Sequence, residues 1–125
     1  LIDFACKYYS EKKCDLITNV MPRSFPRGNS VEVINSNTFV KSYSLQLSKY
    51  NKEHITSYFY ENRRKYKIYN FKNKVNLSNF NFSIDTKDDL KIIRKLFRKY
   101  GSLEEINKYL SINIQPIKED NDQKI

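Results

Sequence analysis

The sequence predicts an α/β fold in which helices cover a layered sheet. Segments with helical apolar spacing alternate along the chain with short segments of strand composition, and the length of 125 residues suits one ordinary domain. Hydrophobic residues make up 39% and aromatic residues 14%, which is enough apolar content for a packed core. A domain of this size needs no disulfide cross-links to fold.

One helix and two strands are expected in the first part of the chain. Apolar and aromatic residues at mixed helical spacing predict a helix over 3–13, with Asp3 as a candidate N-cap. Residues 15–20 have the composition of a short buried strand, and 31–34 alternate as a second strand. Between them, 21–29 is predicted to be a loop, because two prolines fix φ and a glycine permits positive φ.

The middle of the chain predicts two helices and one strand. Ser36 or Asn37 can cap the first helix, which carries aromatic and aliphatic residues along one side. Residues 49–52 are interpreted as a polar break before a second helix over 53–62. Residues 65–72 alternate with a period of two, so they are expected to form a strand.

The last part of the chain predicts a strand, two capped helices and a tail. Residues 80–84 alternate as a strand with three apolar side chains on one face. The T-x-x-D box over 86–89 starts a helix that ends at Gly101, and a second capping box over 102–105 opens a short helix. Residues 114–125 are expected to be a disordered tail.

The charge and the cysteine content restrict which partners and which cellular location are expected for this protein. Lys and Arg number 23 against 14 Asp and Glu, a formal net charge of +9, so an anionic partner is expected. The sequence holds no apolar run long enough to span a membrane. Two cysteines, Cys6 and Cys14, are too few for a disulfide framework, so reduced thiols and a cytoplasmic location are expected.

Asp85 is the most suggestive single residue. It follows a predicted strand and precedes a capped helix, which is where open α/β sheets bind ligands. A carboxylate there suits Mg²⁺, which binds a few protein oxygens together with substrate phosphates. The alternative is that Asp85 is only a turn or cap residue.

His54 and the loop arginines are further candidates. His54 is the only histidine and directly follows Glu53, although a lone histidine is more often structural. Arg23 and Arg27 lie in the proline-containing loop, where stiff guanidinium groups could meet phosphate or carboxylate. A solvated connector is the alternative. The sequence holds no Gly-rich phosphate-binding loop.

The densest basic stretch, 49–74, could bind nucleic acid because Tyr60, Tyr66, Tyr69 and Phe71 are interleaved with its basic residues. The strand period of these aromatic residues argues instead for core packing, and no nucleic-acid-binding motif accompanies them. A solvated basic face is the commoner explanation.

Four segments in order resemble motifs of the cytidylyltransferase family that includes the spore-coat polysaccharide biosynthesis protein, a homologue of CMP-Kdo synthetase. Residues 14–19 look like its strand ending in Ser-Asn or Thr-Asn, and 22–33 resemble P-R-x-[YF]-P-x-G-x-x-V-E-V. Residues 53–58 resemble E-H-V-T-P-Y, and 82–90 resemble W-T-V-D-T-P-E-D-F. Ser57 and Lys87 replace the usual prolines, and Phe82 replaces the usual tryptophan.

The resemblance implies a fold, a reaction and site residues. Residues 1–113 are expected to be the C-terminal half of a Rossmann-like, GT-A-type nucleotidyltransferase fold, a mixed sheet flanked by helices that lacks the N-terminal nucleotide-binding half. The implied reaction transfers CMP from CTP to an acidic sugar for surface polysaccharide, and the fragment alone is expected to be inactive. Asp85 is implied as a ligand of Mg²⁺. The residues implied on the sugar side are Arg23, Arg27, Glu32 and His54.

The resemblance implies CTP and a sugar as partners, and no nucleic acid. Whether the protein forms a homodimer is left open. Two other hypotheses remain at this point: a basic nucleic-acid-binding module without enzymatic activity, and a family member that has lost catalysis.

Overall fold

The computed structural model describes residues 1–45, 47–110, 112 and 114–115. The chain divides into two compact units. The first unit contains Leu1–Thr18 and Glu32–Asn70, and the second contains Asn19–Val31 and the described residues among 71–115. No helix in the described part of the chain is both long and apolar enough to cross a membrane.

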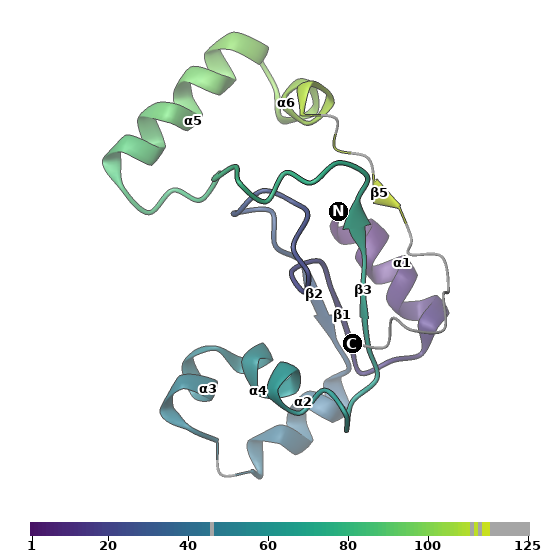
Figure 1. Cartoon of the computed structure of the whole chain (residues 1–125). Helices are drawn as coiled ribbons and strands as arrows, with labels where there is room; N and C mark the ends of the chain where they lie inside the picture. Colours follow the sequence, from purple (N-terminus) through teal and green to yellow (C-terminus); the bar gives the residue numbers. More distant parts are fainter. Residues whose placement is uncertain (46, 111, 113, 116–125) are drawn as a thin grey trace. The chain divides into compact units, whose positions relative to one another are not determined.

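The first unit is built on a three-stranded mixed sheet, shown in Figure 1. The central strand, β1 (Leu16–Thr18), is buried along its whole length. It pairs antiparallel with β2 (Glu32–Ile34) and parallel with β3 (Ile68–Asn70). Burial of all three residues means that the strand is covered on both faces, and this is the strand predicted from 15–20.

Helices cover the two faces of this sheet, because alternate strand residues point to opposite sides. On one face, Phe59 of α4 (Ile55–Glu61) packs with Leu16 and Ile68 in a core cluster. On the other, Tyr8 of α1 (Ile2–Lys12) meets Tyr69 edge to face, with ring centroids 6.5 Å apart. The predicted α/β class, a mixed sheet flanked by helices, is therefore confirmed.

Two caps differ from the sequence prediction. Asp3 lies in the first turn of α1 and does not cap it; Leu1 occupies that position without a side-chain hydrogen bond. The helix α2 (Ser36–Tyr43) is capped by Asn35, whose Oδ1 accepts a hydrogen bond from the backbone N–H of Thr38. Asn35 supplies the acceptor one residue earlier than the predicted Ser36 or Asn37, because its backbone is already extended.

The predicted polar break at 49–52 is wrong, because a short helix, α3 (Lys49–Glu53), occupies it. Ser48 caps this helix through the backbone N–H of Asn51. The Asn51 side chain is buried and donates a 3.0 Å hydrogen bond to Glu61 of α4. A polar segment is therefore helical here because a tertiary partner satisfies its buried amide.

The second unit contains two helices and a two-stranded sheet. The strands β4 (Lys72–Asn73) and β5 (Ile114–Gln115) pair antiparallel. The helices are α5 (Lys87–Tyr100) and α6 (Leu103–Tyr109), and Leu77, Ile106 and Leu110 form a small buried core beside them. The residues 114–115, predicted to begin the tail, thus form a strand, whereas 116–125 lie outside the described residues.

Two predicted strands are corrected by the hydrogen-bonding pattern. The expected strand over 65–72 is two short strands, β3 and β4, which belong to different sheets. The expected strand over 80–84 is reduced to one bridge between Arg27 and Asn81. Its pairing ends there because the Asn81 side chain accepts a 3.0 Å hydrogen bond from the backbone N–H of Ser83.

Candidate functional site

In the first unit, three hydroxyl groups converge on the carboxylate of Glu32. Thr18 and Glu32 lie opposite each other in the β1–β2 pair, and Thr18 Oγ1 lies 3.4 Å from Glu32 Oε1. Thr56 Oγ1 donates to Glu32 Oε2 at 3.0 Å. The Tyr60 hydroxyl, 2.8 Å from Thr18 Oγ1, also hydrogen-bonds Glu32 Oε1. We call Thr18, Glu32, Thr56 and Tyr60 the Glu32 cluster.

The Glu32 cluster presents a fixed acceptor to solvent. Thr18 is fully buried, whereas Glu32 is exposed. Three donors hold the carboxylate oxygens, which have about four lone-pair sites in total. The oriented carboxylate can therefore accept a further hydrogen bond from a ligand hydroxyl or amine, whereas a ligand carboxylate would be repelled there.

His54 lies in the same unit, at the junction of α3 and α4, and its side chain is exposed. Its ring lies 4.7 Å from the ring of Tyr50, centroid to centroid. The backbone carbonyl of His54 accepts a 2.9 Å hydrogen bond from the N–H of Ser57, and Ser57 Oγ bonds the same carbonyl. This turn fixes the backbone beside Thr56, a member of the Glu32 cluster.

In the second unit, Asn19 holds the proline-containing loop. Its buried side chain donates to the carbonyl of Asn29 at 2.8 Å and accepts from the N–H of Val31 at 2.9 Å. The half-buried Arg23 donates from Nη1 to Ser30 Oγ at 3.0 Å. These hydrogen bonds, made by Asn19 and Arg23, hold the two ends of the loop that was predicted to present basic side chains.

Arg27 has an exposed side chain and a paired backbone. Its N–H donates to the carbonyl of Phe80 at 2.9 Å, and its carbonyl accepts from the N–H of Phe82 at 2.8 Å. These two hydrogen bonds attach the loop to the segment that leads into Asp85. The exposed guanidinium of Arg27 therefore extends from a residue whose backbone N–H and carbonyl are both hydrogen-bonded.

Asp85 lies immediately before the capping box of α5. In this box, Asp89 accepts from the N–H and the hydroxyl of Thr86, and the Thr86 side chain accepts from the N–H of Asp89. These hydrogen bonds lower the pKa of Asp89 below its ordinary value, the Thr86 hydroxyl contributing most. Because Asp89 takes the capping role, the exposed Asp85 carboxylate has no hydrogen-bond or ion-pair partner among the described residues.

The side chains around Asp85 suit only one kind of Mg²⁺ site. The described residues contain no group of three or more His, Cys, Asp or Glu side chains that could hold a metal ion. A protein cage is therefore absent from this part of the chain. Mg²⁺ often keeps several waters and binds one or two carboxylates plus substrate phosphates, and a free, exposed carboxylate suits that kind of site.

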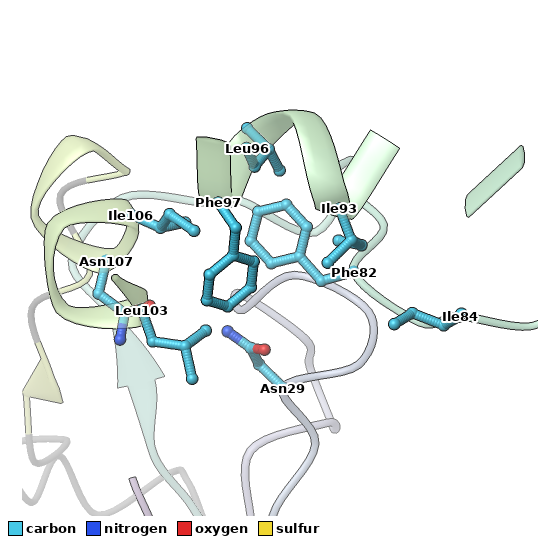
Figure 2. Close-up of a pocket in the computed structure, with 9 residues that line it drawn as sticks. All are labelled: Asn29, Phe82, Ile84, Ile93, Leu96, Phe97, Leu103, Ile106 and Asn107. Carbon is cyan, nitrogen blue, oxygen red and sulfur yellow. The ribbon is translucent and has the colours of Figure 1, made fainter. Parts of the chain in front are cut away.

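An apolar pocket lies next to this segment in the second unit (Figure 2). Phe82 and Ile84, which precede Asp85, line it together with residues of α5 and α6. Among the described residues that line it, the polar ones are Asn29 and Asn107, and its volume is about 210 Å³. Walls of this kind suit an apolar group of a ligand. They exclude this pocket as a binding site for phosphates.

The comparisons with known proteins agree with this architecture. The chain matches a solved structure of a cytidylyltransferase from Leptospira borgpetersenii serovar Hardjo-bovis, strain JB197, with a TM-score of 0.75 and 26% sequence identity. The match covers 94% of this chain and 54% of that one. The fold is that of a cytidylyltransferase-like nucleotidyltransferase. No family model and no curated protein matches the chain.

The predicted site residues of this cytidylyltransferase-like chain fall into two groups. Glu32 and His54 belong to the first unit, and Arg23, Arg27 and Asp85 belong to the second. Within the second unit, paired backbone at Arg27 and 80–82 links the loop to the strand remnant before Asp85. Within the first, Thr56 connects the His54 turn to Glu32.

Sequence reasoning missed the hydroxyl partners of Glu32. Thr56 and Tyr60 are four residues apart, which places them on one face of α4, and this spacing was the available signal. Thr18 could be placed beside Glu32 only once the register of β1 and β2 was known.

The aromatic residues of the basic stretch are engaged within the protein. Tyr66 packs against Phe59 with ring centroids 4.9 Å apart, and Phe71 is fully buried against Phe25. Tyr69 contacts Tyr8, and Tyr60 belongs to the Glu32 cluster. Base stacking needs an open ring face. These rings therefore favour the core-packing interpretation over the nucleic-acid-binding one.

Proposed function

We propose that this protein is a cytidylyltransferase that transfers CMP from CTP to a sugar in the biosynthesis of surface polysaccharide. The observation that carries the proposal is the match of 94% of the chain to a cytidylyltransferase structure at a TM-score of 0.75. The four ordered sequence motifs support the same family. Because the chain spans about half the length of that protein, the whole activity is part of the proposal.

The proposed reaction is a displacement at phosphorus. The oxygen of a sugar hydroxyl attacks the α-phosphate of CTP and gives up its proton to solvent, the bond from that phosphorus to the bridging oxygen breaks, and pyrophosphate leaves as the CMP-sugar forms. Catalysis of this kind depends on positioning and on neutralising phosphate charge. Bound Mg²⁺ would supply that neutralisation, and in this chain the Asp85 carboxylate would hold it.

The remaining residues are proposed to bind the sugar. Glu32, oriented by its three hydroxyl partners, would accept a hydrogen bond from a sugar hydroxyl. Arg23 and Arg27 would pair with a carboxylate or phosphate oxygen, which suits guanidinium groups. His54 would add a ring nitrogen from the α3–α4 junction. Gly28 serves the backbone rather than a ligand, as its close approach to Phe82 indicates.

The test is pyrophosphate release from CTP in the presence of Mg²⁺ and candidate acidic sugars, measured on the protein at its full encoded length. Asp85→Asn should lower the rate about 100-fold or more, the scale expected for loss of a charge-stabilising group in the transition state. Asp88→Asn is the matched control, because Asp88 is an exposed carboxylate three positions away that pairs, within the described part of the chain, with Lys91 alone.

Two outcomes would contradict separate parts of the proposal, the metal ligand and the reaction itself. Full activity of Asp85→Asn would remove Asp85 as a metal ligand while leaving the reaction intact. Absence of pyrophosphate release with every sugar tested, from folded protein, would remove the transferase function. The acidic nature of the sugar, the cytoplasmic location and the homodimer remain predictions from the sequence.

A further inference from the structure

Two adjoining hollows in the first unit form a groove that none of the proposed site residues lines. The first, of about 510 Å³, lies among the end of α1, the start of α2 and the residues before β3. The second, of about 410 Å³, continues along α2 to Tyr66. The two share Asp15, Thr38 and Lys41. The four basic side chains that line them are Lys13, Lys41, Lys65 and Lys67, and we call this surface the lysine groove.

The lysine groove carries a strong excess of positive charge. Asp15 is the single acidic residue among the described residues that line the groove, and it is already engaged: Oδ1 accepts from Thr38 Oγ1 at 2.7 Å, and Oδ2 accepts from the backbone N–H of Lys67 at 2.8 Å. The four lysines form no ion pair with an acidic side chain in the described part of the chain. Like charges gathered in a concave surface raise the local concentration of anions.

The chemistry of the walls indicates which anion fits. Two aromatic side chains line the groove among the described residues. The Tyr66 ring packs on Phe59, with ring centroids 4.9 Å apart, and the Tyr9 hydroxyl accepts a hydrogen bond from Asn35 Nδ2 at 2.9 Å. The Tyr66 ring is therefore held by packing within the protein. Lysine ammonium groups act as point charges, which suit the several oxygens of phosphate groups better than one planar carboxylate.

We propose that the lysine groove binds linked phosphate groups, such as those of inorganic triphosphate or of a nucleoside triphosphate. Four ammonium groups along two connected hollows match a ligand with several adjacent negative charges. The amide and hydroxyl groups of Asn35, Asn37 and Ser44 line the same surface and can donate to phosphate oxygens. None of the residues proposed above for the transfer reaction lines this groove.

The experiment is calorimetric titration of the full chain with inorganic triphosphate in metal-free buffer. The test variant is Lys13→Gln, Lys41→Gln and Lys65→Gln together, because these side chains make no hydrogen bond within the described residues, whereas Lys67 Nζ donates to the carbonyl of Lys12. The control variant is Arg94→Gln, Lys95→Gln and Arg98→Gln together, which removes the same charge from exposed positions of α5.

The groove variant should bind triphosphate about 10-fold more weakly or worse, and the control variant should match the unmodified chain within about 2-fold. CTP should behave like triphosphate if a nucleotide is the source of the phosphates, and cytidine should not bind. Equal weakening in both triple variants would mean unspecific attraction by net charge, and it would overturn the proposal. So would the absence of triphosphate binding to the unmodified chain at low salt.

Discussion

Replacement of Gly28 by alanine tests how the proline-containing loop holds the segment leading to Asp85. Gly28 has a φ of 91°, and a Cβ there would lie 2.6 Å from the carbonyl carbon of Phe82 and 2.7 Å from the nitrogen of Ser83. Ordinary contacts between such atoms are about 3.5–4.0 Å. The backbone at 82–83 must therefore move by about 1 Å to admit a methyl group.

The cost follows from two contributions. A residue other than glycine held at this φ costs about 1–3 kcal/mol. The movement also disrupts the hydrogen bonds from Arg27 N–H to Phe80 and from Phe82 N–H to Arg27, each worth about 0.5–1.5 kcal/mol net. Gly28→Ala should therefore reduce the free energy of unfolding by about 2–6 kcal/mol, which is a large part of the stability of a typical domain.

Urea unfolding followed by far-ultraviolet circular dichroism measures this loss, and Gly101→Ala is its control. Gly101 has a φ of 80°, but nothing lies within 4 Å of its added Cβ, so alanine there costs only the backbone strain. The loss for Gly28→Ala should exceed the loss for Gly101→Ala by about 1–3 kcal/mol. Equal losses would refute the argument, because the close approach to Phe82 would then contribute nothing.

Three further predictions concern single side chains. Asn19→Ala should lower the free energy of unfolding by about 2–4 kcal/mol, read from the urea midpoint, because it leaves two backbone groups of the loop without their partners. The pKa of Asp89 in the folded protein lies below the ordinary value of 3.8. The ionised Asp89 carboxylate therefore stabilises the fold fully above the unfolded-state pKa, and this stabilisation is lost as the pH falls through 3.8 and below. Asp89→Asn should flatten that part of the acid-unfolding curve. Burial raises the pKa of the Cys14 thiol, and the thiolate is the reactive form, so iodoacetamide near neutral pH should modify exposed Cys6 first in peptide mass spectrometry.

The elements predicted well are those whose determinants lie close together in the chain. The capping box of Thr86 and Asp89 and the glycine at the end of α5 were all predicted, because a cap acts on backbone groups within three residues. The buried strand β1 was predicted from the composition of 15–20, which Pro22 follows closely in the chain. The overall α/β class followed from the order of such local signals.

Elements that depend on distant partners could not be placed in this way. The segment 80–84 alternates like a strand, yet only Asn81 finds a bridging partner, at Arg27, and the Asn81 side chain ends the pairing. The helix α3 looks like a polar break until Asn51 is seen bonded to Glu61. Local propensity is a weak prior, and tertiary contacts override it where they satisfy buried polar groups.

The same division applies to the candidate site. The sequence by itself determined that Asp85 follows a strand-like segment and precedes a capped helix, and that Glu32, His54, Arg23 and Arg27 lie in segments resembling one family. The tertiary structure alone decided that Thr18 and Tyr60, 42 residues apart, share the carboxylate of Glu32. The physical reason is register: one residue of slip between β1 and β2 would turn Thr18 to the opposite face, and nothing local fixes that choice.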